Sequence, residues 1–245
     1  MRTTGPGQVL FAVSFIGLGI LSLGSGDFAM NWQPVPPNIP WREPLAYLSG
    51  IMLLGAGLGM FFERARAAAT LVLTLNLAVW LVFLRLPPVA VDPANVAQWL
   101  GFGETLMLVA AGWILVAPQR ARIAQILFGI ALLPVGLSHL VYAQQTAALI
   151  PAWLPWRVPL AYVTGIAHMA AGVALVSGVR ARLAATLEGV MLALFALLVW
   201  APRIAAAPTN RFSATAFLIT IASAGAAGIA AFEISRSTAS RTTSS

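Results

Sequence analysis

The chain has 245 residues, of which 60% are hydrophobic and only 9% are charged. A soluble domain of this size carries about 25% charged residues, so the composition excludes a soluble enzyme, a nucleic-acid-binding protein and a disordered chain. The net charge of +7 comes from 14 arginines, which lie singly or in pairs between apolar runs and form no basic face for nucleic acid. We therefore predict an all-α integral membrane protein.

Eight apolar segments are each near the length of about 20 residues that a bilayer requires. In chain order we predict membrane spans at 8–28, 43–62, 67–86, 95–117, 122–143, 158–177, 182–200 and 212–233. Residues 1–29 have the charge and the apolar core of a signal peptide but no clear cleavage site, and we interpret them as a span. Residues 235–245 are rich in Ser, Thr and Arg, and we predict a disordered cytoplasmic tail there.

The arginines predict the orientation of the spans. Nine of them fall on one side of the predicted spans and five on the other, which favours cytoplasmic N- and C-termini. The nine predicted inner arginines are Arg2, Arg64, Arg66, Arg120, Arg122, Arg180, Arg182, Arg236 and Arg241.

The sequence repeats itself at an offset of 115 residues. The match predicts two four-helix units, 1–118 and 119–234, and an even number of spans in each unit makes the repeat parallel. We thus expect eight transmembrane helices as two parallel four-helix bundle repeats. The matching segments are Pro-Trp-Arg at 40–42 and 155–157, Pro-Leu-Ala-Tyr at 44–47 and 159–162, and, after one inserted residue, Arg-Ala-Arg at 64–66 and 180–182.

Seven of the eight tryptophans and most of the prolines fall on the predicted outer side. One explanation is an interfacial aromatic belt with stiff turns. The other is a pair of ordered lids, formed by the long connections 28–43 and 143–158, because loops on a rigid scaffold often carry function. The sequence leaves both open.

Ionisable residues inside spans are costly and are therefore candidates for a functional site. His139 and Asp27 have glycines three and ten residues before them, so we expect both on seams where helices approach closely. We also expect Asp27 to be the counterpart of His139 in the first unit. Either residue could instead be a polar cap at a helix end.

Three further ionisable residues lie deeper in the predicted spans. His168 is about 15 Å deep at 1.5 Å per residue, between Gly165 and Gly172, and its counterpart in the first unit is Leu53. Glu104 lies at a similar depth and could pair with His168, while Glu188 could extend to the inner surface. A buried neutral histidine with a purely structural role is the alternative.

These residues predict neither a metal site nor a haem site. The chain has no cysteine, and His139 and His168 should differ in depth by roughly 9 Å at 1.5 Å per residue. Ligation of one haem iron needs its two histidines on opposite faces of the same ring.

The second unit resembles the DoxX-like family of bacterial membrane proteins. The resemblance rests on Gly-x-x-His-Leu at 136–140, the prolines of the following loop, Tyr-x-x-Gly-Ile-Ala-His-x-x-x-Gly at 162–172 and Arg-x-Ala-Ala at 182–185. The family's common glutamate aligns with His168. The resemblance implies a four-helix unit in the bacterial cytoplasmic membrane, a link with membrane redox systems, and site residues at His139 and His168 with Tyr162 and Arg157 nearby.

Three functions fit these observations. We expect a redox-associated subunit that binds a quinone or another lipophilic ligand near the outer leaflet through His139, His168, Tyr162, Arg157, Glu104 and Asp27. A quinone headgroup needs one or two hydrogen-bond donors at the end of an apolar cleft, and a soluble or membrane oxidoreductase would be its partner. The alternatives are a small-solute transporter or permease and a non-catalytic scaffold, and the sequence identifies no reaction.

Overall fold

The computed structural model describes residues 5–242, without the side chains of residues 237–242, and all regular structure within this range is helical. Seven helical segments are long and apolar enough to cross a membrane, which indicates a multi-pass membrane protein. They are Pro6–Ser25, Arg66–Val91, Val96–Val116, Pro118–Val141, Arg157–Ser177, Ala181–Ala206 and Arg211–Arg236.

The remaining predicted span, 43–62, corresponds to α2 (Arg42–Gly59). Its 18 residues include Arg42 and Glu43, so its mean hydropathy falls short of the other segments. Its outer surface is nevertheless apolar, because Leu48 and Ile51 are more than half exposed.

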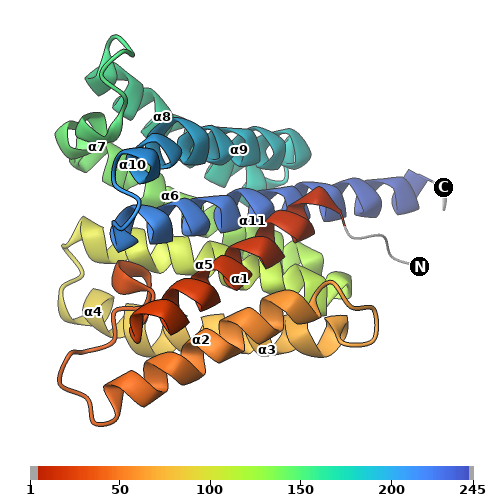
Figure 1. The fold of residues 1–245 in the computed structure, drawn as a ribbon. Helices are drawn as coiled ribbons and strands as arrows, with labels where there is room; N and C mark the ends of the chain where they lie inside the picture. Colours follow the sequence, from red (N-terminus) through yellow and green to blue (C-terminus); the bar gives the residue numbers. More distant parts are fainter. Residues whose placement is uncertain (1–4, 243–245) are drawn as a thin grey trace.

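Two helices form the centre of the molecule (Figure 1). α5 (Val96–Val116) and α11 (Arg211–Thr242) pack against each other and are the most buried spans. α1 (Pro6–Ser25) packs on α11 and α2, and α6 (Ala121–Val141) packs on α5 and α8 (Arg157–Ser177). α3 (Arg66–Val79) packs on α5, and α9 (Ala181–Phe195) packs on α11 from the opposite side of this central pair.

Corresponding helices begin at the same 115-residue offset. α1 and α6 begin at Pro6 and Ala121, and α5 and α11 begin at Val96 and Arg211. α2 and α8 each follow a tryptophan in the left-handed conformation, Trp41 with φ 60° and Trp156 with φ 53°. Non-glycine residues rarely adopt this conformation.

An unusual helical turn also recurs, and its two copies end 115 residues apart. α3 continues through a π-helical turn (Trp80–Arg85) into α4 (Leu86–Val91), and α9 continues through another (Ala196–Trp200) into α10 (Ala201–Ala206). Prolines follow each turn within two residues, at Pro87 and Pro202. Since proline lacks the N–H that would bond to the preceding turn, the helix widens just before it.

α6 and α8 approach each other closely along a glycine seam. A Cβ atom on Gly136 would lie 2.5 Å from the carbonyl oxygen of Gly165, and one on Gly172 would lie 2.7 Å from that of Gly129. Only glycine permits this backbone separation. The seam predicted around His139 is therefore confirmed.

The prediction that Asp27 is the counterpart of His139 on a helix seam is wrong. α1 meets α2 at Gly19, just as α6 meets α8 at Gly136. Three residues further along each helix, Ser22 takes the place of His139. Asp27 lies beyond the end of α1, in the loop that follows it.

The two long connections are ordered and mark what we call the loop end of the bundle. Residues 26–41 contain a short 3₁₀ turn (Met30–Trp32), and residues 142–156 contain α7 (Ala143–Leu149). Trp32 is buried, whereas Trp41, Trp153 and Trp156 are exposed. The tryptophans of this end thus include both interior and surface side chains.

The opposite end, which we call the turn end, carries the short connections around 60–65, 117–120 and 178–180. α1 begins and α11 ends there. α11 runs on to Thr242, so residues 235–242 are helical where the sequence predicted a disordered tail. Residues 243–245 of that prediction lie outside the described part of the chain.

Candidate functional site

The structure brings His139 of α6 and His168 of α8 together, with their ring centroids 5.0 Å apart. This is closer than the depth difference of about 9 Å predicted from helix rise. Helical side chains lean toward the N-terminus of their helix. Since α6 and α8 are antiparallel, His139 and His168 lean toward each other.

His168 is paired with Glu188 of α9, and its Nδ1 lies 2.8 Å from Glu188 Oε1. Both side chains are almost fully buried, at 1% and 0% exposure. The sequence suggested that Glu188 extends to the surface and that Glu104 pairs with His168. The structure instead buries Glu188 and makes it the hydrogen-bonded partner of His168.

Two buried atoms of this pair lack a hydrogen-bond partner among the described residues: His168 Nε2 and Glu188 Oε2. Such atoms are costly to leave unpaired in an apolar interior. Because Nδ1 and Nε2 lie on different sides of the imidazole, Nε2 points away from Glu188. The pair is therefore open to a further partner at both ends.

His139 packs against the His168 side of this pair. Its Nδ1 lies 2.9 Å from the carbonyl oxygen of Val135, which can only accept, so Nδ1 carries the proton and Nε2 remains available. The His139 ring is half-buried, and it stacks on Phe195 with a centroid distance of 6.2 Å. Phe195 also meets His168 edge-on at 6.0 Å. The rings of His139, His168 and Phe195 thus pack against one another.

Glu104 of α5 lies near this cluster. The residue as a whole is partly buried, and the positive charge of Arg85 acts on its carboxylate. Arg85 packs over Gly101, which leaves room for the guanidinium group, and donates a hydrogen bond to the Asn31 carbonyl. Sequence reasoning missed Arg85, because it sits at the end of a span where an arginine usually signals topology.

Trp32 is the other residue that sequence reasoning missed. Its indole is buried near Glu104, and its N–H lacks good hydrogen-bond geometry to any described residue. The ring packs against Phe212 of α11, with centroids 5.7 Å apart. The loop before α2 therefore covers Glu104 at the loop end.

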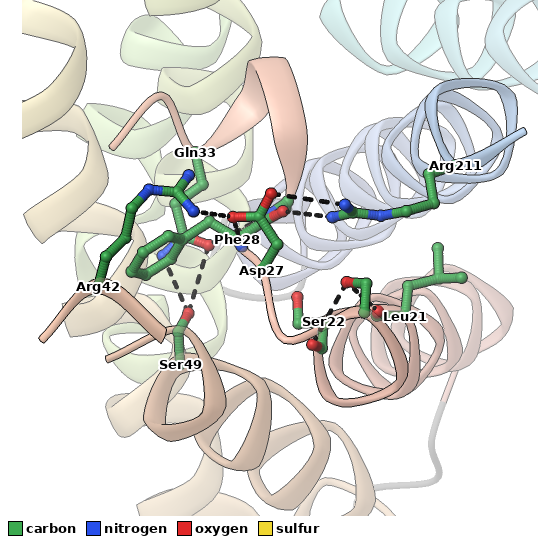
Figure 2. A network of polar contacts seen from close by, with 10 residues as sticks. Leu21, Ser22, Asp27, Phe28, Gln33, Arg42, Ser49 and Arg211 are labelled. Atoms are coloured by element: carbon green, nitrogen blue, oxygen red, sulfur yellow. Dashed lines mark hydrogen bonds and ion pairs between the residues drawn. The ribbon is translucent and has the colours of Figure 1, made fainter. Parts of the chain in front are cut away.

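Asp27 has a different role (Figure 2). Its carboxylate lies between the guanidinium groups of Arg42 and Arg211, where it pairs with Arg42 Nη1 and lies 3.4 Å from Arg211 Nη1. It also accepts a hydrogen bond from the Phe28 N–H, at 2.8 Å. Asp27 therefore ties the loop after α1 to the starts of α2 and α11, which agrees with a polar cap at a helix end.

The charge environment of Asp27 favours its ionised form. Burial by itself would raise its pKa, but the hydrogen bond from Phe28 N–H and the guanidinium groups of Arg42 and Arg211 outweigh that effect. The pKa of Asp27 therefore lies below the usual value of an aspartate.

Arg157 and Tyr162 are not part of the cluster, since both side chains are exposed on α8. Of the predicted ligand-binding residues, the structure brings His139 and His168 into contact and places Glu104 within electrostatic range. Among the residues that the structure describes, no group of three His, Asp or Glu side chains could hold a metal ion.

Comparison with protein-family models, with curated proteins and with solved structures finds no match to this chain.

Proposed function

We propose that α2 is an eighth membrane span, and that the chain consists of two parallel four-helix units with both termini in the cytoplasm. The apolar outer surface of α2 and the common offset of the helix starts support this proposal. The DoxX-like resemblance of the second unit supports a location in the bacterial cytoplasmic membrane.

Single cysteines test this topology, because the natural chain has none. Cysteines at Glu63 and Gln119 should be protected from a membrane-impermeant thiol reagent in right-side-out vesicles. Cysteines at Asn38 and Ala152 should react with it. Equal labelling of positions 38 and 63 would show that α2 does not cross the membrane.

We propose that the cluster of His139, His168 and Phe195 binds a quinone or a similar lipophilic ligand. The observation that carries the proposal is the buried Nε2 of His168, which lacks a partner beside the half-buried His139 ring. An imidazole nitrogen without a proton accepts a hydrogen bond, so the hydroxyl group of the reduced quinone, a quinol, is its suitable partner. The Phe195 ring can stack on the ligand's headgroup. Such a protein would serve a membrane or soluble oxidoreductase as a ligand-binding subunit.

Thermal unfolding of the purified protein with short-chain quinone analogues, in their oxidised and reduced forms, tests this site. We expect the analogues to raise the melting temperature of the wild-type protein and of the exposed-surface control Gln144→Ala. His139→Ala should abolish the shift, because it removes both the accessible nitrogen and the ring that stacks on Phe195. Absence of a shift with every analogue, or an undiminished shift in His139→Ala, would refute the site.

A solute transporter is a second candidate, and one cavity favours it. A cavity of about 660 Å³ opens at the turn end, where Arg122, Gln125 and Glu233 are among the residues that line it. It lies on the opposite side of the bundle from the loop that covers Glu104. Solute uptake into proteoliposomes would distinguish a transporter from a ligand-binding subunit.

A further inference from the structure

A groove of about 350 Å³ lies between α8 and α9, which pack side by side on one flank of the bundle (Figure 1). Apart from Arg180 and Glu188, the residues that line it are alanines, leucines and one methionine. Several of them, such as Ala170 and Leu187, are exposed on the outer surface. The outer surface of a membrane-spanning bundle faces lipid, so hydrocarbon chains have direct access to this groove.

The corresponding helices of the first half are in contact at the place where α8 and α9 leave the groove. Ala174 and Ala184 line the groove, and the residues 115 positions before them are Gly59 and Ala69. A Cβ atom on Gly59 would lie only 2.6 Å from the Cβ atom of Ala69. The repeated fold by itself therefore does not require a groove here.

The length of the groove matches one leaflet of a bilayer. Its lining extends along α9 from Arg180 to Met191, which is about 16 Å at 1.5 Å per residue. The hydrocarbon core of a bilayer is about 30 Å thick, so one leaflet contributes about 15 Å. Because Arg180 directly precedes α9 at the turn end, the groove begins at the membrane surface and ends near the midplane. One acyl chain of a lipid in that leaflet follows the same path.

Arg180 supplies a positive charge where the groove begins. Its side chain is exposed, and it has no hydrogen bond or ion pair within the part of the chain that the structure describes. Its backbone is left-handed, with φ 50°, whereas Ala65, which directly precedes α3, has φ −94°. Non-glycine residues rarely adopt the left-handed conformation, and such strain is common where a residue holds a ligand. A guanidinium group binds phosphate through two parallel N–H···O bonds.

Glu188, the acidic residue of the lining, does not oppose a negatively charged ligand. Its side chain is 0% exposed, and its Oε1 atom lies 2.8 Å from His168 Nδ1. The carboxylate therefore presents no accessible charge to a molecule in the groove. The accessible surface is apolar along the groove and positive at its turn end.

We infer that this groove binds an anionic phospholipid. One acyl chain lies between Ala170 and Leu187, and the phosphate group pairs with Arg180 at the turn end. Basic pockets between membrane helices bind anionic headgroups in the same way. His139 and Phe195 do not line the groove, so the lipid site is separate from the proposed quinone site.

Thermal unfolding of the full-length protein in neutral detergent micelles tests this site, because a ligand that binds only the folded state raises the melting temperature. The probes are phosphatidylglycerol, phosphatidylcholine with the same acyl chains, and inorganic phosphate. We expect a large increase with phosphatidylglycerol, a smaller one with phosphatidylcholine and none with inorganic phosphate. The apparent Kd for phosphatidylglycerol should rise about fivefold in Arg180→Gln, since an arginine near a lipid surface contributes about 1 kcal/mol.

A second variant tests the apolar part of the groove. Ala170→Phe should abolish the effect of phosphatidylglycerol, because the new ring fills the groove from an exposed position. Two matched controls should keep the effect: Arg120→Gln, an exposed arginine of the turn end outside the groove, and Ala68→Phe, on the exposed surface of α3. If Ala170→Phe does not fold, as judged by circular dichroism, the exposed Arg180 variant decides.

Three results would overturn the inference: no increase with phosphatidylglycerol in the wild type, an equal increase with phosphatidylcholine, and an unchanged Kd in Arg180→Gln. An increase with inorganic phosphate as large as that with phosphatidylglycerol would also overturn it, because Arg180 would then bind a free anion. His139→Ala should retain the effect of phosphatidylglycerol, so the lipid site and the quinone site can fail separately.

Discussion

Replacing the buried pair by the residues of the other half gives the sharpest prediction. The variants are His168→Leu, Glu188→Leu and the double variant that carries both. Leu53 stands 115 residues before His168, and Leu73 lies as far from the start of α3 as Glu188 lies from the start of α9. The two leucines are 0% and 1% exposed. The helices around these positions therefore accept leucine on both sides.

The expected free-energy changes follow from the burial of the pair. Removal of one partner from a buried charged pair costs about 3–5 kcal/mol, because the other group remains in the apolar interior without its partner. Replacement of both partners by apolar residues of similar volume is often neutral, or stabilising by about 1–4 kcal/mol. We therefore expect each single variant to lose about 3–5 kcal/mol and the double variant to be at least as stable as the wild type.

Unfolding of the four proteins in mixed detergent micelles, followed by circular dichroism, measures these changes. The coupling energy of the cycle should be several times that of a control cycle on Glu233 and Arg236, which form a partly exposed pair worth about 0.2–1 kcal/mol. Additive losses in the double variant would refute the reasoning.

Three further predictions concern the rest of the fold, and each is measured by unfolding in detergent. Gly136→Val should destabilise the protein by at least about 1–3 kcal/mol, because its Cβ would press on the Gly165 carbonyl, whereas Gly55→Ala, with open space around it, should be neutral or stabilising by about 0.5–1 kcal/mol. Asp27→Asn should cost about 1 kcal/mol at neutral pH, since its two ion pairs are one-third exposed. The lowered pKa of Asp27 makes its contribution complete above about pH 4 and lost as the pH falls through the folded-state pKa, so wild type and Asp27→Asn should become equally stable in acid. Equal stability of the wild type and Asp27→Asn at neutral pH would contradict the expectation for Asp27. An unchanged free energy of unfolding in Gly136→Val would contradict the expectation for the glycine seam.

The sequence by itself determined the helices and one of the contacts between them. Apolar segments of membrane-spanning length predicted most spans, because a bilayer imposes their length and composition. Gly136 and Gly165 predicted a close approach of α6 and α8, since only small residues allow it. That contact was enough to predict that His139 and His168 face protein.

Only the tertiary structure decided which polar groups meet. Helix rise gives the depth of a residue along its own helix, but it does not say which helices are neighbours or which way a side chain leans. Glu104 and Glu188 were therefore both possible partners for His168, and the packing of α8 against α9 selected Glu188. The same limit applied to Asp27, which pairs with Arg211 from a helix that begins 184 residues later. A short polar contact between distant segments is set by the whole bundle, and no local pattern encodes it.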